Sequence, residues 1–435
     1  MTEHLDDPAD LDDLTTDVLV VGGGPAGSAA ALRLARAGHD VTLVEKRPVG
    51  RHKSCGDLVS PRALAELQLL GTDLVTAPTG GSALATAAHH VAGVRFTHGG
   101  RCTSVAWPQH PGFPGHGVVV RREILDQHLR DEAARAGATV LMGHEATAPI
   151  AERGFVRGAT MTLPGGGQRA IRARFVVVAD GANSRFGRGL GTSRRRNWPY
   201  AIAARTYFAS PRSTETWIES AVGLPDHHGN PIAGYGWVTP MGDGNVNVGV
   251  GVLSTHRDIK GLNTLKLLDA FCDRMSADWQ YDASRRLKDP TRLRLPLGGS
   301  IEPKMGPTFL VVGDAAGAAN PFNGDGVDAA LLCARLAAGV LDEALTTENS
   351  TTLQRYPMLL ADELGRFRKV GRLSARFLGR PAILKPALEL AVRSDATMGA
   401  VLRIAGNELR ARPDAGGAER AYAVAALVSH LAPSW

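Results

Sequence analysis

The stretch Val18-Leu19-Val20-Val21-Gly22-Gly23-Gly24-Pro25-Ala26-Gly27-Ser28 decides the fold of this chain of 435 residues. The apolar run at 18–21 predicts a buried strand, and the alanine-rich stretch at 28–37 predicts a helix. The glycines between them predict a tight turn. A strand, a glycine turn and a helix in this order are typical of a dinucleotide-binding unit.

Each glycine of this turn has a separate physical use. Gly22 permits the turn, Gly24 lets the backbone approach a pyrophosphate, and Gly27 lets helix and strand pack closely. Unpaired N–H groups and the helix dipole then face the phosphates, so the first helical residues, Pro25 and Ala26, are further expected contacts.

A carboxylate ends the second predicted strand. The apolar residues 41–44 lead to Glu45, which Lys46 follows, and we expect both residues to contact the cofactor. A carboxylate at this position can accept both ribose hydroxyls and would repel a 2'-phosphate. The sequence therefore favours FAD or NAD over NADP.

A second glycine-rich segment lies far along the chain. Gly313-Asp314-Ala315-Ala316 follows the apolar run at 308–312 and leads into Pro321-Phe322-Asn323-Gly324-Asp325-Gly326. Asp314 can bind ribityl or pyrophosphate-linked hydroxyls, or it can cap a helix. A helix from Gly326, after the turn at Gly324, would aim its positive end at a flavin pyrimidine. Both segments together predict FAD.

The arrangement of predicted elements indicates an α/β protein, α+β overall. We expect a lead-in at 1–15, a discontinuous Rossmann-like FAD-binding domain at 16–75, 118–195 and 300–350, an inserted antiparallel substrate-binding sheet at 76–117 and 196–299, and a helical region at 351–435. The alternation at 245–250 predicts a half-buried strand. Arg122 opens a predicted helix at 122–136 and either pairs with an FAD phosphate or lies exposed, and Asp180-Gly181 follows a predicted strand at 175–179.

Composition sets weaker limits. The net charge of +6 is modest, the arginines are dispersed, and no zinc-finger spacing occurs, so we expect no nucleic-acid partner. The four cysteines lack metal spacing, which predicts no metal site and a reducing compartment, the cytoplasm. The acidic start is unlike a signal peptide, and no apolar run is long enough to span a bilayer. Membrane contact would then be peripheral, on the inner face of the plasma membrane.

Four motifs in order resemble the p-hydroxybenzoate hydroxylase-like flavoproteins: the Gly22 turn with Glu45, Arg122, Asp180-Gly181, and Gly313-Asp314 with its followers. Two further motifs, Lys53-Ser54-Cys55-Gly56-Asp57 and Tyr235-Gly236-Trp237-Val238-Thr239-Pro240, resemble the geranylgeranyl reductase family, which saturates isoprenoid double bonds. Within that family, Gly234-Tyr235-Gly236-Trp237 with the following Asn-Val-Gly strand resembles actinobacterial menaquinone reductases, which reduce one isoprene unit of the quinone tail. Ser54, Leu58 and Thr239 depart from the family pattern, so the prenyl substrate and the bond reduced stay open.

The resemblance implies roles at the flavin. Cys55 would protonate the alkene beside the isoalloxazine, with Gly56 as a cofactor contact, although Cys55 could also be a packed small residue. Asp57 either holds a proton-relay water or caps a helix. Tyr235, Trp237 and Pro240 would line the substrate cavity, or serve as core.

A basic segment at 366–380 carries six arginines and lysines, no acid, and interleaved apolar residues. It either docks on an anionic membrane leaflet or packs as a helix on the body of the protein.

These observations predict an FAD-dependent reductase that saturates an isoprenoid C=C bond of a prenyl lipid, with menaquinone or a geranylgeranyl compound as substrate. The alternatives are an aromatic monooxygenase of the same fold and a non-catalytic flavin- or quinone-binding protein. A halogenase is disfavoured because no lysine occurs between Lys53 and Lys260. NAD(P)H, a ferredoxin or a quinol could each donate the electrons, and the oligomeric state stays open.

Overall fold

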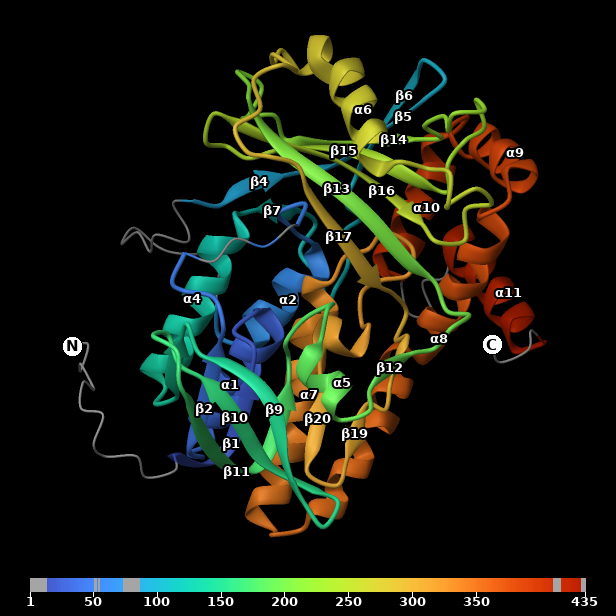
Figure 1. The fold of residues 1–435 in the computed structure, drawn as a ribbon. Coiled ribbons are helices and arrows are strands. Elements are labelled where there is room, and N and C mark those ends of the chain that lie inside the picture. The colour runs from blue at the N-terminus through green and yellow to red at the C-terminus, as the bar shows by residue number, and fades with distance from the viewer. Residues whose placement is uncertain (1–13, 51–52, 54, 73–86, 410–415, 432–435) are drawn as a thin grey trace.

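The computed structural model describes residues 14–50, 53, 55–72, 87–409 and 416–431. Figure 1 shows one sheet with its helices in the lower half, a second sheet above it, and the C-terminal helices along one side. Residues 1–13 of the expected lead-in and part of the expected insertion at 76–117 lie outside the described residues. The first strand begins at Leu14.

The lower sheet is largely parallel, as the strand-turn-helix pattern predicts. Its main strands run in the order β19-β20-β11-β1-β2-β8, all parallel to their neighbours except β19. Strand β10 pairs antiparallel with β11, and β9 pairs antiparallel with β10. The strands are β1 (Leu14–Val21), β2 (Val41–Glu45), β8 (Thr139–Met142), β9 (Glu145–Glu152), β10 (Phe155–Thr162), β11 (Gln168–Val178), β19 (Met305–Gly306) and β20 (Phe309–Val311).

Small side chains bring the helices close to this sheet. Helix α1 (Pro25–Arg36) buries its alanines against α7 (Val327–Thr346), and α4 (Arg122–Arg135) and α2 (Pro61–Leu69) join the same core. A Cβ on Gly27 would lie 1.9 Å from the Gly22 carbonyl oxygen, so only glycine permits this approach of α1 to the end of β1. The expected roles of the glycine turn in packing therefore follow directly from sterics.

The upper sheet is antiparallel except for one parallel pair, β14 with β5. Its strand order is β17-β13-β16-β15-β14-β5-β6. The strands are β5 (Gly93–His98), β6 (Arg101–Ala106), β13 (Tyr200–Ala209), β14 (Trp217–Val222), β15 (Gly234–Pro240), β16 (Asn245–Leu253) and β17 (Thr291–Pro296). Helix α6 (Thr264–Trp279) covers one face through residues such as Leu268 and Phe271.

The strand predicted at 245–250 lies in an antiparallel sheet, but the prediction that it is half-buried is wrong. Residues 246–250 of β16 are all buried, because α6 covers one face of the sheet and the other face meets the segment around Asp57. The valines of β16 face the apolar core under α6, and Asn247 faces a polar network on the other side of the sheet.

Smaller elements connect the two sheets. A three-stranded sheet holds β3 (Leu58–Val59), β7 (Gly117–Val119) and β4 (His89–Val91), and β12 (Ser193–Arg194) pairs with β18 (Ile301–Glu302). The short helices are α5 (Arg185–Gly189), η1 (Gly313–Ala316) and η2 (Ser350–Gln354). The C-terminal helices are α8 (Arg355–Leu378), α9 (Pro381–Ala391), α10 (Asp395–Gly406) and α11 (Gly417–Leu431). No helix in the described ranges is long and apolar enough to cross a membrane.

The basic segment at 366–380 forms the second half of α8. Phe367 and Val370 are buried, and the Arg372 and Arg376 guanidiniums donate to the carbonyl oxygens of Gly298 (2.7 Å) and Asn197 (3.0 Å). The segment therefore packs its apolar side on the body of the protein. Phe377, near the end of the segment, is 47% exposed, so contact of this segment with a membrane leaflet stays a prediction.

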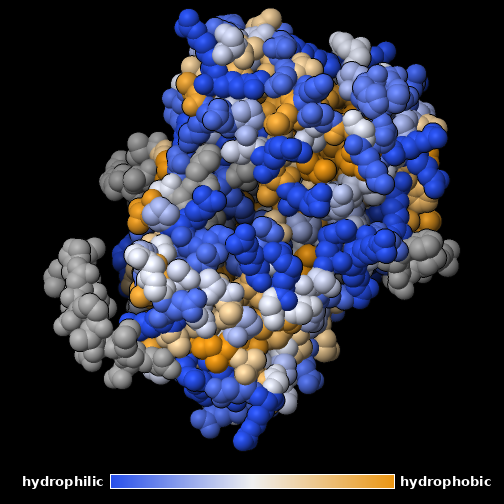
Figure 2. All heavy atoms as spheres, viewed as in Figure 1, coloured by the Kyte–Doolittle hydropathy of each residue, from blue (hydrophilic) through white to orange (hydrophobic). Residues whose placement is uncertain are grey.

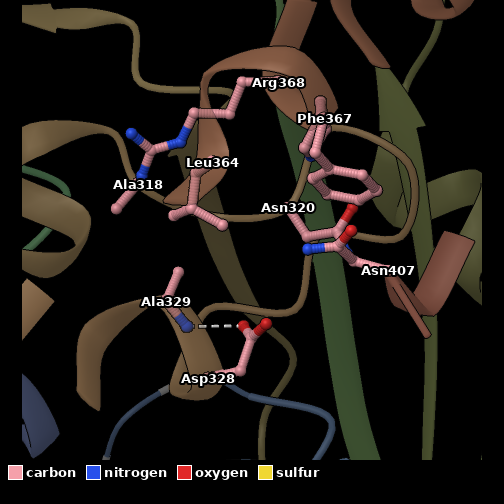
Figure 3. A pocket seen from close by; sticks show the side chains of 9 residues that line it. Ala318, Asn320, Asp328, Ala329, Leu364, Phe367, Arg368 and Asn407 are labelled. Atoms are coloured by element: carbon pink, nitrogen blue, oxygen red, sulfur yellow. Dashed lines mark hydrogen bonds between the residues drawn. The ribbon is translucent and has the colours of Figure 1, made fainter. Parts of the chain in front are cut away.

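The C-terminal helices contact the second glycine-rich segment, and a small hollow lies between them (Figure 3). The Asn320 side-chain amide donates to the Ala405 carbonyl oxygen (2.7 Å), and the Arg62 guanidinium donates to the Asn407 carbonyl oxygen (3.1 Å). Figure 3 shows Asp328 bonded to the backbone of Ala329 at the base of the hollow. The lining residues are Ala318, Asn320, Pro321, Asp328, Ala329, Leu364, Phe367, Arg368 and Asn407.

Two buried carboxyl groups at this junction have altered acidity. Burial raises the pKa of Glu408 to about 8, reinforced by Asp325 and Asp328 and opposed by Arg62. Burial and the neighbouring Asp325 raise the pKa of Asp328 to about 7. The folded protein thus binds these protons more tightly than the unfolded chain does, where a glutamate has a pKa of about 4.3.

The junction should therefore weaken as the pH rises. The stability that protonated Glu408 contributes is complete below about pH 4 and is lost as the pH rises through 8. Glu408→Gln removes this titration. Between pH 6 and 8 the free energy of unfolding should decrease in both proteins, and the decrease should be at least about 1 kcal/mol larger in the wild type than in Glu408→Gln. Urea titrations of both proteins at each pH measure this difference. Parallel pH dependences of the two proteins would contradict the assignment.

Candidate functional site

Strand ends of the lower sheet gather four of the predicted cofactor residues at one edge. Gly22 follows β1, Glu45 ends β2, Asp180 lies just after β11, and Gly313 lies just after β20. The strands run side by side to their ends, since Gly22 N–H donates to the Val44 carbonyl (2.8 Å) and Val312 N–H to the Val178 carbonyl (3.0 Å). In open parallel sheets, ligands bind at this carboxyl edge.

The two glycine-rich segments meet at this edge. A Cβ on Gly313, whose φ is +59°, would lie 2.8 Å from the Ala26 Cβ, and one on Gly326 would lie 3.1 Å from Asp314 Oδ1. The start of α1, the turn of η1 and the start of α7 therefore form one continuous surface. Gly324, with φ +75°, turns the chain toward α7.

The residues present at this surface fit a dinucleotide such as FAD. Helix α1 starts at Gly24 with no side-chain cap and with Pro25 in its first turn, so the following N–H groups are available to phosphate. Asp180 Oδ1 is buried with no hydrogen-bond partner among the described residues, which is the state expected of a group that awaits a ligand hydroxyl. Burial also raises the pKa of Asp180.

The Glu45 carboxylate supports the glycine turn. It accepts hydrogen bonds from the backbone N–H groups of Gly23 (2.8 Å) and Arg47 (3.0 Å) and is almost fully buried. Lys46 is directed elsewhere, with its ammonium 3.8 Å from the Glu145 carboxylate. A ribose contact for Glu45 and a cofactor contact for Lys46 stay predictions.

Two other predicted cofactor residues have protein partners. The Lys53 ammonium donates to Asp314 Oδ2 (2.8 Å), and the Arg122 guanidinium binds both oxygens of Asp126 (2.9 and 3.0 Å). Lys53 was not among the expected site residues. It ties the Cys-Gly-Asp segment to η1, although the two lie far apart in the sequence.

The turn formed by Cys55, Gly56 and Asp57 is held by three donors. Asp57 is 1% exposed and has a left-handed backbone, with φ +62°. Its carboxylate accepts from the Tyr207 hydroxyl (2.6 Å), the Asn247 side-chain amide (2.8 Å) and Arg122 N–H (3.3 Å). Both oxygens are engaged, so this carboxylate fixes the shape of the turn.

Asn247 connects this turn to the aromatic residues of the upper sheet. Its amide nitrogen also donates to the Cys55 carbonyl oxygen (2.8 Å), and its oxygen accepts from Trp237 Nε1 (3.1 Å). Trp237 packs on Gly249, where a Cβ would lie 2.1 Å from the indole ring. The Trp237 nitrogen would also lie 3.7 Å from a Cβ on Gly56.

Tyr235 and Trp237 together form an aromatic wall on the upper sheet. The Tyr235 ring centroid is 5.9 Å from that of Trp237, and the Tyr235 hydroxyl donates to the Asn323 carbonyl oxygen (2.5 Å) of the second glycine-rich segment. The upper sheet thus contacts both the Cys-Gly-Asp turn and the segment that precedes α7.

Electrostatics at the site favour protonated phenols beside a fixed positive charge. Burial, followed by Asp325 and Cys55, raises the pKa of Tyr235, and burial with Asp57 raises that of Tyr207. Burial lowers the pKa of Arg122, but Asp126 and the sulfur of Cys55 reverse this effect, and the guanidinium stays charged. Cys55 is half-buried. The Arg122 guanidinium therefore lies beside both the Asp126 carboxylate and the Cys55 sulfur.

Pro240 does not join this group. Tyr235 and Trp237 lie on one face of β15. Pro240 lies on the opposite face with Gly236 and Val238, and that face meets α6. Sequence reasoning missed Tyr207, Asn247 and Lys53. The one available signal was Asn247 itself, a polar residue within a valine-rich strand, which needs a buried partner.

Comparisons with known proteins agree with this geometry. The family model for an FAD binding domain matches residues 15–358. A menaquinone reductase of Mycobacterium tuberculosis is 38% identical over 91% of this chain and 92% of its own length, and a digeranylgeranylglycerophospholipid reductase of Methanoculleus marisnigri is 30% identical over 76% and 77%. The solved structure of a geranylgeranyl bacteriochlorophyll reductase-like protein from Thermoplasma acidophilum is 25% identical, with a TM-score of 0.72 over 94% of this chain and 96% of that one.

The extent of these matches shows the family. FAD is the cofactor of the matched domain, and the surface at the carboxyl edge of the lower sheet has the donors for it. The chain therefore belongs to the FAD-binding-domain family and, within it, to the geranylgeranyl reductase family of flavin-dependent oxidoreductases, together with the menaquinone reductases.

Proposed function

We propose that this chain saturates one isoprenoid C=C bond of a prenyl lipid, and that the lipid is menaquinone. The observation that carries the proposal is the half-buried Cys55 thiol, held beside the Arg122 guanidinium on a turn that packs against Trp237. Likeness to menaquinone reductases over nine tenths of the chain supports the choice of lipid.

Reduction of an isolated alkene requires a hydride and a proton. When bound at the carboxyl edge of the lower sheet and reduced, FAD would supply the hydride to one carbon. We assign the proton to the Cys55 Sγ–H, which is transferred to the other carbon and leaves a thiolate. The Arg122 guanidinium interacts with the Cys55 sulfur, and we assign it the stabilisation of that thiolate. The two transfers together saturate the bond.

The aromatic wall has a matching role. Protonation of a trisubstituted alkene develops positive charge on the more substituted carbon. The faces of Tyr235 and Trp237 can stabilise such charge through their quadrupoles, and they exclude water that would otherwise capture the cation. Because burial keeps Tyr235 protonated, its ring stays a neutral surface.

Asp57 acts as a positioning residue in this proposal. All the donors around its carboxylate come from the protein backbone, Tyr207 and Asn247, so its function is to fix the turn that presents Cys55. The substrate is a membrane lipid, so the proposed place of action is the inner face of the plasma membrane, with the protein bound peripherally to an anionic leaflet.

Cys55→Ala should retain FAD and lose turnover. Loss of a positioned acid costs about a hundred-fold or more in rate. Visible absorbance measures the flavin content, and mass spectrometry of menaquinone measures the gain of two hydrogens. Cys102→Ala is the matched control, because Cys102 is exposed on β6. Wild-type turnover in Cys55→Ala would remove Cys55 from the reaction.

Gly24→Val should yield protein without bound flavin. A branched side chain at the start of α1 would obstruct the approach of a pyrophosphate to the helix N–H groups. The absorbance of the purified protein near the flavin bands gives the result. Gly339→Ala, in α7 with open space around its Cβ position, serves as the control. Normal flavin content in Gly24→Val would refute this placement of the cofactor.

The function itself is tested in cells. Mass spectrometry of quinones and other prenyl lipids, with and without the gene, should show a deficit of two hydrogens in menaquinone that the wild type restores and Cys55→Ala does not. Unchanged saturation in every prenyl lipid would refute the proposal and leave the hydroxylase or a non-catalytic flavoprotein.

A further inference from the structure

Helix α9 presents an apolar face to solvent. Five of its residues recur at the spacing of one helix face and are exposed or at the border of exposure: Ala382, Ile383, Pro386, Ala387 and Leu390. Leu390 is 64% exposed and Ile383 is 37% exposed. A helix on the surface of a water-soluble protein normally turns a polar face outward, so α9 is built to meet an apolar environment.

The opposite face of α9 is also apolar, and it is packed. Leu384 is buried, and the Leu388 side chain approaches Gly223, where a Cβ would lie 2.9 Å from Leu388 Cδ1. Gly223 follows Val222 of β14, which pairs with Tyr235 in the sheet. The helix is thus fixed to the end of the sheet that bears the proposed substrate wall.

Helix α11 adds a second exposed apolar stripe. Val424, Leu427 and Val428 are 63%, 67% and 48% exposed, at the i, i+3, i+4 spacing of one face. Figure 1 shows α9 and α11 along the same side of the molecule, and Figure 2 shows hydrophobic residues in orange along that side. Exposed Phe377, at the end of α8, lies a few residues before α9.

The charges around these stripes are predominantly positive. Between 376 and 431, in the part that the structure describes, the exposed ionic side chains are the cations Arg380, Lys385, Arg393 and Arg420 and the acids Glu389 and Asp395. Arg376 is half-buried at the same end of α8. Two copies of such a surface would repel each other, whereas an anionic bilayer attracts it and also buries its apolar residues.

A continuous apolar cluster leads from this surface to the Cys-Gly-Asp turn. Val392 at the end of α9 and Met398 and Leu402 of α10 share one cluster with residues of the upper sheet. At its other end the cluster includes Tyr207, whose hydroxyl binds Asp57, and packs against Leu58, which follows Asp57. This packed cluster therefore fixes α9 and α10 to the part of the upper sheet that lies against the turn.

We propose that α9 and α11 form a membrane-docking surface, through which the protein binds the anionic bilayer that holds its substrate. This inference rests on the proposed function for the identity of the substrate. The docking itself requires only the exposed apolar faces and their cationic border.

The test is vesicle binding by the flavin-loaded full chain. The wild type should co-sediment with vesicles that contain phosphatidylglycerol in phosphatidylcholine more than with phosphatidylcholine alone. The double variant Ile383→Glu, Leu390→Glu should bind these vesicles about ten- to hundred-fold less, which is the loss expected when a large apolar side chain no longer enters the bilayer. Leu287→Glu is the matched control, because Leu287 is 51% exposed outside α9 and α11.

Activity assays separate docking from chemistry. The double variant should retain FAD and reduce menaquinone in detergent micelles at the wild-type rate, while its rate on menaquinone in vesicles falls by a similar factor of about ten or more. Equal vesicle binding by variant and wild type would overturn the proposal, as would a change of oligomeric state in the variant, which would make this face a contact between copies. Vesicle binding without reduction of any prenyl lipid would refute the proposed function and leave the docking surface intact.

Discussion

The structure depends on the side-chain amide of Asn247. Its nitrogen donates to both the Cys55 carbonyl and the Asp57 carboxylate, and its oxygen accepts from Trp237. Asn247 is completely buried, so each lost bond would leave a polar group without water, at a cost of about 1–3 kcal/mol. One amide thereby fixes the distance between the turn that carries Cys55 and the aromatic wall of the upper sheet. The proposed chemistry requires that distance, because the proton donor and the surface that stabilises positive charge must meet the same double bond.

The fold could be predicted from the sequence where local sterics decide it. A side chain on Gly22 or Gly27 would clash with neighbouring backbone atoms, so glycine is required at both positions. The apolar runs on either side then permit a single order of strand, turn and helix. The same holds for the segment at 313–326, whose glycines allow α7 to start beside Asp314. The resemblance to the family then predicted which residues would lie near a flavin.

The rest of the site could not be predicted because it depends on contacts between distant segments. Asp57 and Asn247 are 190 positions apart, and Lys53 and Asp314 are 261 apart, so no local pattern links them. Amphipathic spacing likewise cannot tell which apolar helix face is covered. The spacing at 366–380 indicated an interfacial helix, yet Phe367 and Val370 pack on the protein, and the larger exposed apolar faces belong to α9 and α11. Pro240 shows the same limit, since it is adjacent to the wall in sequence but lies on the other face of β15.

The division of labour between the two sheets follows from these contacts. The lower sheet and the N-terminus of α1 carry the polar groups expected to hold phosphates and sugar, among them the buried Asp180. The proposed protonation of an alkene requires dry surroundings instead, and the proposal assigns these to Tyr235 and Trp237 of the upper sheet. These requirements conflict within one pocket, and the chain separates them by placing Cys55 on the segment between the sheets. Lys53 holds one end of that segment to η1, and Asp57 holds the other end to Tyr207 and Asn247. The thiol is therefore fixed at the boundary where the cofactor surface and the apolar wall meet.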